Sequence, residues 1–160
     1  MRMTDQFQDG SKKKLIVSPI ENGTVVDHLP PGTAVKIAQM LGLMGDSVVI
    51  IGQNLKSTKF GRKDLIKVEG KFLGEHELNK VALLAPNATV NIVRDSVITE
   101  KKHVAVPDFV ERVALCANTN CITNKENVPT RFITASKLPL VMVCNYCGYE
   151  TKGEELKLKG

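Results

Sequence analysis

Apolar residues along the first hundred positions recur with two periods, one typical of strands and one typical of helices. Short runs rich in valine and isoleucine, bounded by turn residues such as Asn22-Gly23, predict strands. The predicted strands are 15–20, 24–28, 47–52, 63–69 and 89–93, and Val97-Ile98 extends the same sheet.

Two segments between these strands carry the helical period. Ala34, Ile37, Ala38 and Leu41 are spaced i, i+3, i+4, i+7, and Thr33 precedes them as a candidate N-cap. A second helix is predicted over 75–84, with acidic residues in its first turn and a proline two residues after its end.

The element order is β-α-β-β-α-β, which predicts a ferredoxin-like domain of the α+β class over residues 15–102. Residues 1–14 are polar and are expected to form a disordered tip. Residues 101–107 are interpreted as a linker, and 103–160 as a second, small antiparallel-β domain. Its predicted strands are 113–115, 131–135, 140–143 and a piece near Tyr149.

The chain's four cysteines all lie in this second domain, with the spacing Cys116-x4-Cys121-x22-Cys144-x2-Cys147. Two close pairs of thiols with none to spare favour a closed tetrahedral site for one structural Zn²⁺ ion over free thiols or a redox pair. The glycine after Cys147 is typical of the tight turn in such a site. The x4 spacing differs from the x2 of common zinc ribbons.

Composition narrows the class of protein further. Apolar residues make up 42% of the 160, enough for a buried core, but aromatics are only 4%, so the core must be aliphatic. The formal net charge of +5 falls to about +3 once four thiolates hold Zn²⁺. No apolar run approaches the ~20 residues of a membrane span, so a cytoplasmic protein without membrane contact is expected.

A second candidate site lies on the predicted sheet. Lys63 and Lys67 are four residues apart and face the same side of one strand, and Asn91 and Val93 share a face of another. The ordinary explanation for this pattern is that the lysines lie on a solvated face of the sheet. The functional explanation is a site in which the lysines bind phosphate groups and the amide of Asn91 contacts a nucleobase. No nucleophile, paired carboxylates or glycine-rich phosphate loop accompanies Asp27-His28, so we expect no catalytic residues and no enzymatic activity.

Four segments together resemble one family. They are 22–30 (Asn-Gly-Thr-Val-Val-Asp-His-Leu-Pro), 61–67 (Gly-Arg-Lys-Asp-Leu-Ile-Lys), 85–91 (Ala-Pro-Asn-Ala-Thr-Val-Asn) and 118–122 (Asn-Thr-Asn-Cys-Ile). With the cysteine spacing, the chain closely resembles the regulatory chains of aspartate carbamoyltransferase over about residues 15–150.

The resemblance implies a noncatalytic subunit in pyrimidine biosynthesis. Its first domain would bind CTP, ATP or UTP and pair with a second regulatory chain, and its zinc domain would contact the catalytic chain. Carried over by position, the nucleotide site would comprise Val17, Ile20, Asp27, His28, Lys63, Lys67, Asn91, Val93 and Lys101.

Two positions depart from the best-known members of this family. Ser18 stands in place of a glutamate beside the base, and Ser96 in place of an aromatic near the base pocket. The alternatives are a zinc-ribbon protein that binds nucleic acid and a transcription regulator that binds a small molecule. Basic residues are scattered over the second domain, which disfavours nucleic acid as a partner.

Overall fold

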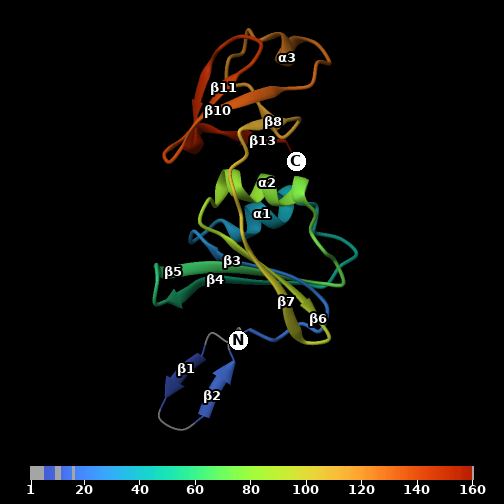
Figure 1. The fold of residues 1–160 in the computed structure, drawn as a ribbon, viewed down its shortest axis with the longest axis vertical. Helices are drawn as coiled ribbons and strands as arrows, with labels where there is room; N and C mark the ends of the chain where they lie inside the picture. Colours follow the sequence, from blue (N-terminus) through green and yellow to red (C-terminus); the bar gives the residue numbers. More distant parts are fainter. Residues whose placement is uncertain (1–5, 10–11, 16, 160) are drawn as a thin grey trace.

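The computed structural model describes residues 6–9, 12–15 and 17–159, and Figure 1 shows them as two modules. The N-terminal module contains a five-stranded antiparallel sheet in the order β4-β5-β3-β6-β7. Its strands are β3 (Gly23–Leu29), β4 (Val49–Ser57), β5 (Gly61–Glu69), β6 (Thr89–Arg94) and β7 (Val97–His103). The first four follow the predicted ferredoxin-like order, and β7 adds an edge strand beside β6.

Two helices, α1 (Ala34–Met40) and α2 (Glu75–Leu84), cover one face of this sheet. In β5 and β6 and in the first half of β3 the even-numbered residues point toward them, and in β4 the odd-numbered Val49 and Ile51 do so, as the two-residue period requires within each strand. Val26, Ile66 and Val68 are therefore fully buried with Ile37 of α1 and Val81 of α2. The predicted aliphatic core is thus the layer between sheet and helices.

The start of α1 depends on a residue distant in sequence. Thr33 occupies the N-cap position, but its hydroxyl donates to the Pro30 carbonyl and makes no cap bond. Asp64 of β5 accepts from the backbone N–H groups of Gly32 (2.8 Å) and Ala34 (3.1 Å) instead. Thr33 is thus the N-cap residue as predicted, but Asp64, which is fully buried, takes the role of its side chain and connects α1 to the sheet.

Gly23 allows two strands to approach each other at the start of β3. Its φ is +148°, and a Cβ built at this position would lie 1.9 Å from the carbonyl oxygen of Val68. Any side chain there would separate β3 from β5, so the turn at Asn22-Gly23 requires glycine.

The C-terminal module is small and mostly antiparallel. One sheet has the order β12-β11-β10-β8, and a two-strand ribbon pairs β13 with β9. The elements are β8 (Phe109–Glu111), β9 (Ala114–Leu115), α3 (Ile122–Lys125), β10 (Arg131–Lys137), β11 (Leu140–Cys144), β12 (Glu150–Lys152), a 3₁₀ turn (Gly153–Glu155) and β13 (Lys157–Leu158). The predicted strands correspond to β9, β10, β11 and β12, whereas β8 and β13 were not predicted.

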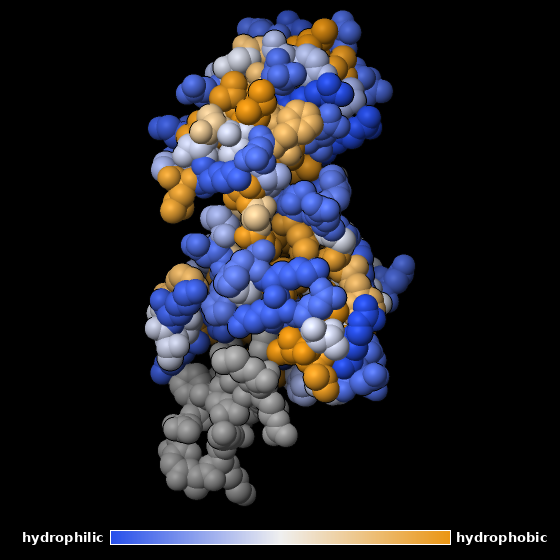
Figure 2. Space-filling model, viewed as in Figure 1, coloured by the Kyte–Doolittle hydropathy of each residue, from blue (hydrophilic) through white to orange (hydrophobic). Residues whose placement is uncertain are grey.

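The two modules meet on the helix side of the large sheet, so α1 and α2 lie between the sheet and the C-terminal module (Figure 1). Val104 and Val106 of the connecting segment are buried. They belong to one apolar cluster that continues from the sheet–helix layer to Phe132 and Met142 of the second module. Figure 2 shows apolar surface at this junction and on the C-terminal module.

The N-terminal segment differs from expectation. Residues 1–14 were predicted to be disordered, but β1 (Gln6–Asp9) and β2 (Lys12–Leu15) pair as an antiparallel ribbon; residues 1–5 and 10–11 lie outside the described residues. Of the strand predicted over 15–20, Leu15 belongs to β2, residue 16 lies outside the described residues, and 17–20 is irregular, since Pro19 has no N–H to offer a sheet. None of the helices in the described ranges is both long and apolar enough to cross a membrane.

Candidate functional site

The face of the sheet turned away from the helices, here called the open face, carries a row of residues in cross-strand register. Ile50, Lys67, Val25, Asn91 and Lys101 lie side by side across β4, β5, β3, β6 and β7. Cross-strand neighbours have their Cβ atoms about 5 Å apart, so the row places two lysines and an amide on one surface. The alternation predicted from the sequence accounts for Lys67 and Asn91, whereas Lys101, predicted to lie in a linker, is part of β7.

The open face changes in character along the strands. At the end near the start of β3, Ile20, Val25 and Val93 form a small buried apolar cluster, with Ile50 and Ile98 packed against it. Charged and polar side chains gather toward the opposite end, at Asp27 and Lys63. One end of the face is therefore suited to an apolar or aromatic group and the other to an ionic one.

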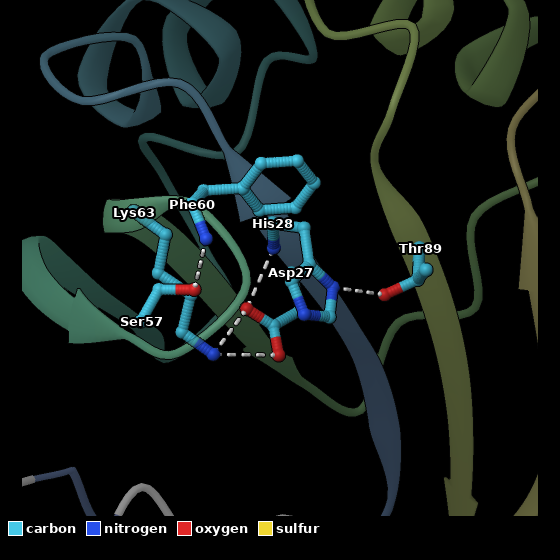
Figure 3. Close-up of polar contacts among 6 residues, drawn as sticks. All are labelled: Asp27, His28, Ser57, Phe60, Lys63 and Thr89. Atoms are coloured by element: carbon cyan, nitrogen blue, oxygen red, sulfur yellow. Dashed lines mark hydrogen bonds and ion pairs between the residues drawn. The ribbon is translucent and has the colours of Figure 1, made fainter.

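Asp27 and Lys63 form a buried ion pair at the charged end. The Lys63 Nζ lies 3.0 Å from Oδ1 and 3.2 Å from Oδ2 of Asp27, and both residues are 6% exposed. The Asp27 carboxylate also accepts from the backbone N–H of His28 at 2.6 Å. These contacts orient the carboxylate and the ammonium group on the open face (Figure 3).

His28 reaches the open face through a break in the strand. Strict alternation would place it on the helix side with Val26, but the β3–β5 register shifts between Val26 and Leu29, and His28 has φ +58°. Its Nδ1 then lies 2.9 Å from Thr89 Oγ1 (Figure 3). Burial, assisted by the charges of Lys63, Lys59 and Lys101 and opposed by Asp27, holds the pKa of His28 below its usual value.

Lys67 is fixed by the segment that precedes β3. Its Nζ donates to the carbonyl oxygen of Ser18 at 2.9 Å. The same segment is held to the β6–β7 turn, where Asp95 N–H donates to Asn22 Oδ1 and Ser96 N–H donates to the Glu21 carbonyl. The backbone near Ile20 therefore has a defined position over the apolar end of the face.

The structure brings eight of the nine predicted nucleotide-site residues onto the open face or against it. The ninth, Val17, is half-buried in the segment next to Ser18. Thr89, which binds His28, was not predicted; its position two residues before Asn91 on the same strand face was the available signal. The backbone carbonyl of Ser18 was also missed, because the pattern of side chains does not predict main-chain contacts.

The four cysteines come together in the C-terminal module. Their sulfur atoms all lie within 4.8 Å of one another, with Cys116–Cys147 at 3.6 Å and Cys121–Cys144 at 3.8 Å. Cys116 and Cys121 flank the loop 117–120, and Cys144 ends β11. Gly148 has φ +74°, which permits the tight turn behind Cys147. Sulfur atoms at these separations can surround one metal ion.

Polar groups around the sulfurs support metal binding. Thr123 Oγ1 donates to Cys121 Sγ at 3.2 Å, and Asn124 Nδ2 donates to the carbonyls of Cys116 and Asn118, which holds the loop. Burial raises the pKa of Cys116 and Cys144. Burial also acts to raise that of Cys147, but hydrogen bonds from the Tyr149 backbone, Asn118 and neighbouring thiols lower it to about 7.

These thiols fit a metal centre by their chemistry. Three of the four are buried and only Cys147 is exposed, so four sulfurs would enclose an ion with no position left open for a substrate. A cluster of this kind without metal leaves buried thiols in contact with one another. We infer that the described cluster is a metal site with a structural role.

Both modules match models of known protein families. A family model described as the aspartate carbamoyltransferase regulatory chain, allosteric domain, matches residues 15–105, and another described as the metal binding domain of the same chain matches residues 108–157. The chain is 50% identical over 135 residues to the aspartate carbamoyltransferase regulatory chain of Thermococcus sibiricus, covering 84% of this chain and 90% of the relative.

Two further relatives carry the same description. That of Pyrococcus abyssi is 48% identical over 146 residues, covering 89% of this chain and 96% of its own length. That of Methanopyrus kandleri is 49% identical over 146 residues, covering 89% of this chain and 94% of its own length. The similarity thus extends over both modules and does not favour a nucleic-acid-binding zinc ribbon.

Proposed function

The chain belongs to the family of aspartate carbamoyltransferase regulatory chains, and on that premise we propose that it binds a nucleoside triphosphate on the open face and transmits this event to catalytic chains. CTP, ATP and UTP are the proposed effectors. The chain itself is a noncatalytic subunit that serves pyrimidine biosynthesis.

The observation that carries this proposal is the gradient along the open face. A nucleotide has an aromatic base at one end and anionic phosphates at the other, and the face has Ile20, Val25 and Val93 at one end and cations at the other. Lys67 and Asn91 lie between the two ends, beside the expected position of the ribose. His28 and Lys101 would contact phosphates, and Lys63, oriented by Asp27, would add a further charge.

Base recognition would use the backbone around Ile20 together with Val17. Lys67 already donates to the Ser18 carbonyl, so the segment 17–20 and the middle of the sheet are joined at this point. Serine at positions 18 and 96 offers small hydroxyl groups where bulkier groups occur in the best-known family members. We therefore propose that the selectivity between CTP and ATP is set differently in this chain.

The metal of the second module is proposed to be a single structural Zn²⁺ ion per chain, because four thiolates in a closed set are the donors that zinc prefers. Cys116, Cys121, Cys144 and Cys147 would hold it. Metal binding would also deprotonate the buried thiols, so the folded module and the bound ion depend on each other.

The proposed partners are the catalytic chains, which the zinc module would contact, and a second regulatory chain. The surface of the zinc module includes the exposed apolar residues Phe109, Ile133 and Leu138. A nucleotide can alter catalysis only if it binds one state of the assembly better than another, and coupling of about 1–3 kcal/mol would suffice. We place the protein in the cytoplasm, where a reducing environment keeps thiols available for zinc.

Calorimetric titration of the full chain with CTP, ATP and UTP tests the nucleotide proposal. Binding of at least one of them, with one site per chain, is expected. A pull-down with the catalytic chain, before and after chelation of the metal, tests the second half; chelation should dissociate the two chains with little loss of catalytic turnover. An assembly that stays intact after metal analysis shows the ion to be gone contradicts it.

A further inference from the structure

The turn between β4 and β5 lies next to the charged end of the open face. None of its residues belongs to the nucleotide site proposed above. The turn consists of residues 58–60 and is closed by the pair Ser57–Gly61. Gly61, which closes the turn, has φ +75°, a left-handed conformation that glycine adopts without strain, and the Phe60 N–H donates to Ser57 Oγ at 3.2 Å. The turn therefore has a defined conformation.

The side chain of Phe60 packs against His28. Their ring centroids are 5.7 Å apart with an interplanar angle of 67°, an edge-to-face arrangement (Figure 3). His28 is thus held between Phe60 and Thr89, which bonds its Nδ1 at 2.9 Å. Thr89 engages Nδ1, and Phe60 helps to fix the orientation of the imidazole ring. Together they set the position of the other ring nitrogen, Nε2.

Lys59 extends the cationic group at this end. Its Nζ lies 5.2 Å from the centroid of the Phe60 ring, and Lys59 is exposed. Its charge acts on His28 together with those of Lys63 and Lys101, and among the described residues Asp27 is the acidic group that opposes them. Because Asp27 is already paired with Lys63, Lys59 and Lys101 leave this end with an excess of positive charge.

We propose that this turn is a further part of the effector site: Lys59 binds the terminal phosphates of the nucleotide, and Phe60 is a positioning residue that orients His28 toward them. This rests on the proposed nucleotide-binding function and deepens it, since it makes the turn a sensor of phosphate number. An exposed lysine on a hairpin turn can follow the outermost phosphates, whereas the buried Lys63 and Lys67 are fixed by Asp27 and Ser18.

The test compares K59Q with the wild-type full chain by calorimetry, using CTP and CMP as probes. Removing one partly exposed charge contact should weaken CTP binding about fivefold and change CMP binding less than twofold. The matched control is K36Q: Lys36 is an exposed lysine of α1, on the opposite side of the sheet, so the same loss of charge should leave both affinities unchanged.

The role of Phe60 is tested with F60L and F60Y. Loss of the ring in F60L should raise the pKa of His28, measured by NMR titration, toward its usual value, and should weaken CTP binding; F60Y, which keeps the ring, should restore both. A K59Q chain with an unchanged ratio of CTP to CMP affinity overturns the role of Lys59, and an unaltered His28 titration in F60L overturns that of Phe60. If the wild-type chain binds neither nucleotide, the proposed function fails first, and this inference fails with it.

Discussion

The two modules keep their folds by different means. In the N-terminal module, aliphatic residues from three strands and two helices fill a continuous layer, with Val26, Ile37 and Ile66 fully buried. In the C-terminal module the largest fully buried side chains are Phe132, Met142 and Val113, and three of the four cysteines are buried as well. A large apolar layer stabilises a domain by itself, whereas a domain of some fifty residues needs a metal or a comparable constraint.

This difference explains where each module can carry polar residues. The helix face of the sheet supplies the stability of the first module, so its other face can keep a buried lysine–aspartate pair and a buried asparagine. Such groups cost free energy when they are buried, and only a well-packed domain tolerates them. In the second module the polar groups of Thr123 and Asn124 serve the sulfur cluster instead.

The largest expected effect comes from Cys121→Ser. Loss of one buried ligand should abolish tight metal binding, worth about 10–16 kcal/mol in small zinc domains, and unfold the C-terminal module. Hydrogen exchange should show lost amide protection there, while the sheet module keeps its protection and its nucleotide affinity. Thr123→Ala is the control, since it removes only a hydroxyl beside Cys121 and should retain the metal. Equal amide protection of both modules in Cys121→Ser would contradict the idea that only the C-terminal module depends on metal.

Asp64→Ala should have the next largest effect and act on the first module. The carboxylate accepts three backbone N–H groups, from Gly32, Ala34 and Asn54, and each buried donor left without an acceptor costs about 1–3 kcal/mol. We expect the free energy of unfolding to fall by about 3 kcal/mol or more in urea denaturation. Asp46→Ala, at an exposed aspartate, should change it by no more than about 0.5 kcal/mol; similar values for both variants would remove Asp64 as a structural link.

Lys67→Ala should weaken nucleotide binding by about 1.5–3 kcal/mol, the contribution of a charge-assisted hydrogen bond. Calorimetry with CTP and ATP measures this, and circular dichroism checks that the variant is folded. Lys36→Ala serves as the matched control on the helix side. Unchanged affinity in Lys67→Ala would remove Lys67 from the site.

The smallest effect is a pH dependence of binding. Burial lowers the pKa of His28 in the free chain, so the neutral imidazole predominates at pH 7. Nearby phosphates stabilise the protonated form and raise this pKa, so the complex holds more protons and affinity rises as the pH falls from 8 toward 6, by about 1.4 kcal/mol for each unit of pKa difference. Proton uptake, measured by calorimetry in buffers of different ionisation enthalpy, should vanish in His28→Gln but persist in His76→Gln.

Local patterns were enough to predict much of the fold. The valine and isoleucine runs and the helical spacing of Ala34, Ile37 and Leu41 predicted the ferredoxin-like order, and the structure and family comparisons confirm the fold class. The length of β7 was not predicted, because its second half, Glu100–His103, is polar and exposed. The role of Asp64 was also missed, since a carboxylate thirty residues from a helix start leaves no local signal.

The candidate sites were predictable to different degrees. Cysteine spacing alone identified the metal site, because four sulfurs in two close pairs have few other uses. Strand alternation predicted that Lys63 and Lys67 share one face of a strand and that Asn91 and Val93 share a face of another, and the sheet register joins the two sets on the open face. His28 reaches that face because its own backbone has φ +58°. Strict alternation would have placed its side chain on the helix side.

The layer of helices between the sheet and the metal module has an evolutionary consequence. The sheet that carries the residues proposed for the nucleotide and the module that carries the four cysteines lie on opposite sides of α1 and α2. Substitutions near the proposed base site, such as those at Ser18 and Ser96, can therefore accumulate without altering the metal module, which is proposed to contact the catalytic chains. Effector preference can diverge between lineages while the architecture of the enzyme complex stays the same.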